Sequence, residues 1–128
     1  LSLSMSLQWQ QSMKNRDIEI AIREIVNRLR SFPISRIILF GSSAEGSTGS
    51  DSDLDLAVIV SSPDKFSTYD ERLETKSMIR AAIRDINRTI PIDILLYTES
   101  EFSELLMDGG FLADEVQAKG ETIYEKAG

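Results

Sequence analysis

Residues 53–60 restrict most strongly how this chain can fold. They read Asp-Leu-Asp-Leu-Ala-Val-Ile-Val, and this alternation has the period of two that is typical of a β-strand. Such a strand places Asp53, Asp55 and Ala57 on one face and Leu54, Leu56 and Val58 on the other. Asp is a poor strand former, and like charges on one face repel each other. We therefore expect a positive group to lie between the two carboxylates.

The rest of the chain predicts helices and further strands. Residues 16–29 have the apolar spacing of an amphipathic helix with Asn15 as its N-cap, and Thr68 with Glu71 predicts a second helix that runs to about Arg88. The expected core face of this second helix is Leu73, Ile79, Ala82, Ile83, Ile86 and Ile90, whereas Arg80, Arg84 and Arg88 are interpreted as a solvated face. We expect strands at 36–40, 92–97 and 122–124, and short helices at 100–106 and at 111–119, the latter closed by Gly120.

The chain has 128 residues, no His and no Cys. This length suits one domain, and we predict a flexible segment at 1–13 and a single domain at 14–128. The composition excludes thiol nucleophiles, an imidazole base and zinc sites built on nitrogen or sulfur. The net charge of −7 argues against a broad nucleic-acid surface, and no apolar run is long enough for a membrane span. We expect a cytoplasmic protein that contacts no membrane and meets nucleic acid only indirectly.

A loop rich in Gly and Ser precedes the acidic strand. Residues 41–46 read Gly-Ser-Ser-Ala-Glu-Gly directly after the strand expected at 36–40. Backbone N–H groups and hydroxyls at Gly41 and Ser42 could hold phosphates. Mg²⁺ is commonly held by one or two carboxylates together with substrate phosphates. We therefore interpret the loop, Asp53 and Asp55 as one predicted site for a nucleotide and its metal.

Asp93 adds a third acidic residue in a strand that is otherwise Ile, Leu and Tyr. An unpaired carboxylate buried there would be costly. If this strand lies beside residues 53–60, the three carboxylates can converge around a pair of Mg²⁺ ions, as two-metal phosphoryl or nucleotidyl transfer requires. Asp93 would then accept the proton of the attacking hydroxyl or activate it as a metal ligand.

The combined motif resembles the nucleotidyltransferase superfamily related to DNA polymerase β. The residues that carry the resemblance are Gly41-Ser42-x-Ala44-x-Gly46, Ser52-Asp53-x-Asp55-Leu56 and Asp93. The small size and the ending at 120–125 are most similar to minimal nucleotidyltransferases of bacteria and archaea. The resemblance spans residues 18–125 and implies an α+β fold with a mixed β-sheet flanked by helices. It implies that Gly41 and Ser42 bind the nucleotide, and that Asp53, Asp55 and Asp93 are the catalytic, metal-binding acids.

The same resemblance implies an enzyme that uses Mg²⁺, two ions in the expected site, to transfer a nucleoside monophosphate to a hydroxyl. AMP from ATP is the first expectation, and a protein partner is the expected acceptor. Minimal members commonly pair with a small helical HEPN protein, and in some toxin–antitoxin pairs the transferase adds AMP to the toxin. A homo-oligomer is also compatible with the sequence.

Two departures from the family pattern leave other functions open. Many members carry Arg at the positions of Ser43 and Glu45, and Glu45 would repel a triphosphate unless it points away or pairs with a cation such as Arg36. The chain also lacks the helical substrate domain of the aminoglycoside-modifying relatives. The alternatives are a non-catalytic antitoxin that neutralises a helical partner by contact, and a small-molecule nucleotidyltransferase of the aminoglycoside type that works as a dimer.

Overall fold

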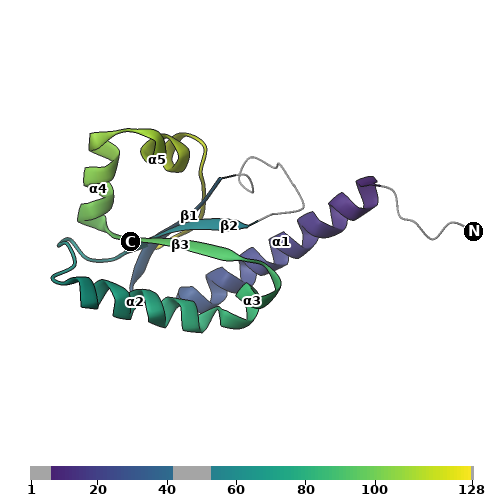
Figure 1. Ribbon diagram of the computed structural model, residues 1–128, viewed down its shortest axis with the longest axis horizontal. Coiled ribbons are helices and arrows are strands. Elements are labelled where there is room, and N and C mark those ends of the chain that lie inside the picture. Colours follow the sequence, from purple (N-terminus) through teal and green to yellow (C-terminus); the bar gives the residue numbers. More distant parts are fainter. Residues whose placement is uncertain (1–6, 42–52, 128) are drawn as a thin grey trace, which may run out of the picture.

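A four-stranded mixed sheet forms the centre of the fold in a computed structural model, which describes residues 7–41 and 53–127 (Figure 1). The strands are β1 (Ile34–Phe40), β2 (Leu54–Val60), β3 (Ile92–Thr98) and β4 (Glu121–Glu125). The helices are α1 (Leu7–Leu29), α2 (Tyr69–Ala82), α3 (Arg84–Thr89), α4 (Glu99–Asp108) and α5 (Phe111–Ala113), followed by a π-helical turn η1 (Asp114–Ala118). None of the helices in the described ranges is long and apolar enough to cross a membrane.

The strand order is β3-β2-β1-β4. β1 pairs antiparallel with both β2 and β4, whereas β2 and β3 are parallel and are joined through α2 and α3. β3 is therefore an edge strand, beside β2, which contains Asp55 and directly follows Asp53. The α+β class, the mixed sheet and the flanking helices are confirmed.

Helices cover both faces of the sheet, which explains the alternation in the sequence. One face packs against α1, α2 and the start of α3, and its buried strand residues include Leu54, Leu56, Val58, Ile92, Ile94 and Leu96. The opposite face packs against α4 and η1 around a smaller core of Ile38, Ala57, Ile59, Phe102 and Val116. Figure 1 shows α1, α2 and α3 on one side of the sheet and α4 and α5 on the other. The expected two-sided pattern of residues 53–58 and 92–97 is thus confirmed.

Several helix boundaries differ from the expectation. α1 begins at Leu7, so Asn15 lies inside it rather than capping it; residues 7–14 contain no Gly or Pro, and their Leu, Gln, Met and Lys residues favour a helix. Residues 1–6 lie outside the described ranges, and the flexibility of residues 1–13 stays a prediction.

The second predicted helix is two helices. Thr68 caps α2 as expected, with the Glu71 N–H donating to its Oγ1 at 3.1 Å. The helix ends at Ala82, because the Ile83 N–H turns back to the Arg80 carbonyl, and α3 follows. Apolar spacing continues across this break, so periodicity could not reveal it. Of the expected core face, Ile79 and Ile83 are buried, Ala82, Ile86 and Ile90 pack against the core, and Leu73 is 43% exposed.

The structure of the C-terminal region also differs from the prediction. Residues 111–119 form α5 and η1 rather than a single α-helix, and Lys119 is the C-cap. Gly120 is not among the described glycines with positive φ. A Cβ at Gly120 would instead overlap the Val116 carbonyl oxygen and come within 2.7 Å of Ile38 Cγ2. Close packing therefore requires glycine there, rather than a left-handed cap.

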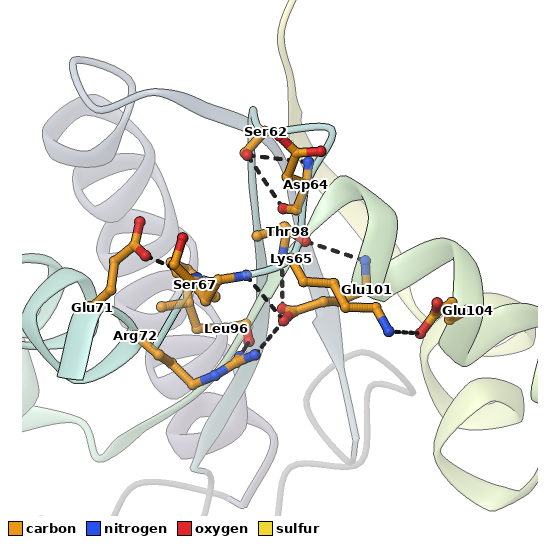
Figure 2. Close-up of polar contacts among 11 residues, drawn as sticks. Ser62, Asp64, Lys65, Ser67, Glu71, Arg72, Leu96, Thr98, Glu101 and Glu104 are labelled. Atoms are coloured by element: carbon orange, nitrogen blue, oxygen red, sulfur yellow. Dashed lines mark hydrogen bonds and ion pairs between the residues drawn. The ribbon is translucent and has the colours of Figure 1, made fainter. Parts of the chain in front are cut away.

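Arg72 and Glu101 fasten α2 to the free edge of β3 (Figure 2). Arg72 Nη1 donates to the Leu96 carbonyl at 2.6 Å, and Nη2 donates to Glu101 Oε2 at 2.5 Å. Glu101 also accepts the Thr98 N–H at 3.0 Å as part of the capping box of α4. The Arg72 guanidinium lies over the Phe66 ring, 4.7 Å from its centroid. One charged pair thus joins the two helical layers around the edge of the sheet.

We predict that Glu101→Ala lowers the free energy of unfolding by about 2–4 kcal/mol, because it leaves the partly buried Arg72 guanidinium without its carboxylate and removes the cap acceptor. Chemical denaturation of the purified chain measures this. Glu104→Ala on the same helix removes only the exposed pair with Lys65 (3.1 Å) and should cost about 0.5 kcal/mol or less. Equal losses in the two variants would contradict the role assigned to Arg72 and Glu101.

Candidate functional site

The predicted site residues that the structure describes, Gly41, Asp53, Asp55 and Asp93, lie at one end of the sheet. β1 ends at Phe40 and leads into Gly41, whereas β2 and β3 begin there with Asp55 and Asp93 near their starts. Phe40 is the antiparallel partner of Asp55, and Asp93 is its parallel partner. The Leu54 N–H donates to the Pro91 carbonyl at 2.9 Å, which sets this register at the beginning of both strands. The prediction that the strand of Asp93 lies beside the strand of Asp53 is confirmed.

The acidic residues project from the face that α4 and η1 cover, but at the end of the sheet that these helices leave open. The smaller core under α4 and η1 includes Ala57 and Ile59, with Tyr97 packed against it. Asp55 and Asp93 precede these residues on β2 and β3. Asp53 and Asp55 are partly exposed, and Asp93 is exposed. The carboxylates therefore line a surface that a ligand in solution can reach.

Gly41 lies directly against the Asp55 side chain. Its φ is +78°, in the region that favours glycine. A Cβ at this position would overlap Asp55 Oδ2 and lie 3.4 Å from Asp55 Cγ. The first residue of the Gly-Ser loop thus gives both the backbone turn and the room that the carboxylate occupies.

The site has an unfavourable concentration of negative charge. Burial raises the pKa of the Asp55 carboxyl above its ordinary value, and the negative charges of Asp93 and then Asp53 raise it further. Asp93 and Asp53 are thus both close enough for their charges to act on Asp55. A hard divalent cation would relieve the repulsion, and carboxylate oxygens are ligands that Mg²⁺ prefers.

The donor set therefore fits a divalent cation, although its geometry is not that of a closed metal site. Within residues 7–41 and 53–127, no three acidic side chains are already gathered closely enough to enclose an ion. Metal binding would require the carboxylates to draw together. The roles of Asp53, Asp55 and Asp93 as metal ligands stay predictions.

The remaining expectations for the loop have different outcomes. Ser42, Ser43, Ala44, Glu45, Gly46 and Ser52 lie outside the described residues. Arg36, considered as a partner for Glu45, donates to Thr122 Oγ1 at 3.1 Å and lies over the Phe102 ring, 5.8 Å from its centroid. It lies near the start of β1, whereas the loop follows the end of that strand.

Lys76 is a residue near the site that the sequence pattern does not distinguish. This residue of α2 is partly buried, and its ammonium interacts electrostatically with Asp93. Lys76 lies four positions from Arg72 and four from Arg80, so it belongs to the same basic row as Arg80, Arg84 and Arg88. This spacing gives no reason to distinguish Lys76 from the residues expected to be solvated. Only the pairing of α2 with the edge of β3 brings it toward the acidic residues.

We predict that Asp55→Asn raises the thermal unfolding midpoint at pH 7 in a buffer without divalent cations. Because the pKa of Asp55 is raised in the folded chain, the folded state binds more protons than the unfolded state, and this carboxyl makes folding less favourable as pH rises above about 4. The advantage of the variant should shrink below pH 4. Calorimetry across pH 3.5–7 tests this, and a variant less stable than the parent at pH 7 would contradict it.

We also predict that Gly41→Ala costs more stability than Gly109→Ala. Both glycines have positive φ (78° and 73°), so both substitutions carry a conformational cost of about 1–2 kcal/mol. Nothing lies within 4 Å of a Cβ at Gly109, whereas a Cβ at Gly41 displaces the Asp55 carboxylate. Denaturant titration of both variants separates the two effects, and equal costs would show that the contact with Asp55 is unimportant.

Comparison with known proteins agrees with this arrangement. Residues 20–126 match the family profile of the nucleotidyltransferase domain. No curated protein matches the chain. Among solved structures, a toxin–antitoxin complex with AMP-PNP shares 20% identity at a TM-score of 0.52 over 82% of this chain and 73% of that one. A proposed nucleotidyltransferase from Sulfolobus solfataricus shares 16% identity at a TM-score of 0.59 over 98% and 94% of the two chains. Because the family profile covers most of the sequence, the chain belongs to the nucleotidyltransferase domain family.

Proposed function

We propose that this chain transfers AMP from ATP to a hydroxyl group of a protein partner, with Mg²⁺ as cofactor. The observation that carries the proposal is the parallel register that sets Asp55 opposite Asp93, with Gly41 packed against the Asp55 carboxylate. Family membership supports the reaction class. A likeness to a toxin–antitoxin structure that contains AMP-PNP supports ATP as the donor and a toxin as the partner. That this toxin is a small helical HEPN protein follows from the family resemblance of the sequence.

In the proposed reaction the acceptor oxygen attacks the α-phosphorus of ATP. The new bond forms between these two atoms, the bond from the α-phosphorus to the bridging oxygen breaks, and pyrophosphate leaves with the electron pair. Asp93 takes the proton of the hydroxyl. Asp53 and Asp55, with Asp93, would hold Mg²⁺, and the bound ion would supply positive charge against the phosphoryl oxygens.

The position of each residue suits its proposed role. Gly41 opens the loop at the end of β1, where the nucleotide phosphates are expected with Ser42. Asp93 lies on the edge strand on the other side of Asp55, so it is the acid that an acceptor can approach from outside the sheet. The proposed acceptor is another molecule, which accords with described helices that pack as a single layer on each face of the sheet.

We predict that Asp53→Asn and Asp93→Asn each lower AMP transfer at least roughly a hundredfold, because each removes a carboxylate from the metal-binding set. Labelled ATP, Mg²⁺ and a co-purifying helical partner give the measurement, and Asp64→Asn, an exposed residue beyond the opposite end of β2, is the matched control. Removal of Mg²⁺ by a chelator should abolish transfer by the parent chain.

The same variants separate catalysis from simple contact. If Asp53→Asn binds the partner but no longer neutralises it, enzymatic modification is required. If neutralisation is complete without transfer, the chain is a contact antitoxin and the proposal fails. Transfer to an aminoglycoside in place of the protein would instead indicate a small-molecule nucleotidyltransferase.

A further inference from the structure

Lys76 lies beside the edge strand that carries Asp93. The bond from Arg72 to the Leu96 carbonyl fixes α2 against the free edge of β3. Since α2 and α3 connect two parallel strands, this helical segment runs back toward the start of β3. Four helical residues advance about 6 Å, and the three residues from Leu96 to Asp93 span about 10 Å of strand. The backbone of Lys76 therefore stops about 4 Å short of the level of Asp93 along the strand, which a lysine side chain can span. The charge of Asp93 does act on the Lys76 ammonium.

Lys76 is partly buried, and Asp93 acts on it through charge rather than through a direct ion pair. In the part of the chain that the structure describes, its ammonium makes no hydrogen bond or ion pair with a carboxylate. Burial lowers its pKa and the positive charges of Arg80 and Arg72 lower it further, while the negative charge of Asp93 opposes part of this shift. Other basic residues of this acidic chain do pair: Lys65 with Glu104, Arg72 with Glu101 and Arg28 with Glu24.

A partly buried ammonium with positive neighbours is unfavourable unless an anion meets it. The acidic site beside it offers a reason for such an anion to be present. If Asp53, Asp55 and Asp93 hold Mg²⁺, the reacting phosphoryl group must lie against them, with its oxygens near the start of β3. A lysine serves this purpose as a compact point charge with three donors.

We infer that Lys76 binds the α-phosphoryl oxygens of the nucleotide from the β3 side of the site, opposite Gly41. This inference rests on the proposed function, because it uses the position that a nucleotide would take at the three carboxylates. It assigns to α2 a role in substrate binding in addition to covering the sheet. The rest of the basic row, Arg80, Arg84 and Arg88, is exposed and keeps the solvated role expected from the sequence.

Calorimetric titration of the full chain with ATP and Mg²⁺ tests the inference. Lys76→Gln should weaken ATP binding about tenfold or more, since a hydrogen bond to a charged group is lost. Lys76→Arg, which keeps the charge, should stay within about threefold of the parent. Arg84→Gln, an exposed member of the same row, should bind ATP as the parent does. Thermal unfolding midpoints of all variants should remain close to that of the parent, which separates binding from folding.

Each outcome has a distinct meaning. Unchanged ATP affinity in Lys76→Gln overturns the inference and leaves the proposed function intact. An equal loss in Lys76→Gln and Lys76→Arg also overturns it, because the charge is then not what matters. Should Lys76→Gln fold poorly, Lys76→Met, which keeps the length of the side chain, replaces it under the same criteria. If the parent chain does not bind ATP with Mg²⁺, the proposed function itself fails.

Discussion

The parallel pairing of β2 with β3 is the interaction on which the candidate site depends. It sets Leu54 opposite Ile92 and Asp55 opposite Asp93. A shift of one residue would turn Asp93 toward the face packed by α1 and α2, where Ile92 and Ile94 are buried. The hydrophobic pattern that stabilises the core therefore also selects the position of the carboxylates.

The same end of the sheet gathers the negative charges of Asp53, Asp55 and Asp93. Burial and the negative charges of Asp93 and Asp53 raise the pKa of Asp55. Gly41 leaves room for the Asp55 carboxylate and has a positive φ that other residues rarely adopt. Such local conflict is typical of functional sites, which give up some stability for a ligand. The rest of the fold supplies that stability through two cores, one on each face of the sheet.

Edge strand β3 connects the structural and functional parts of the molecule. Near its C-terminal end, Arg72 covers a free carbonyl and joins Glu101, which holds α2 and α4 together (Figure 2). Near its N-terminal end, the strand presents Asp93 with Lys76 beside it. A free sheet edge is open to unwanted pairing, and in this chain α2 lies along it and caps the Leu96 carbonyl with Arg72. The proposed approach of an acceptor uses the end of this edge that lies near the acids.

The sequence by itself determined the strands, the core faces and the acidic motif, because an alternation of period two and a capping Thr are local signals. Leu54, Leu56 and Ile94 are buried as expected, and Thr68 caps its helix. Local signals failed where contacts between distant residues decide. Leu73 is exposed although it lies on the predicted apolar face, and α2 ends before Ile83 without any break in apolar spacing. Only the tertiary structure decided which strand would pair with the strand of Asp93, and that Lys76 would lie near Asp93. Strand order and helix docking are set by contacts between residues far apart in the chain, which no periodicity records.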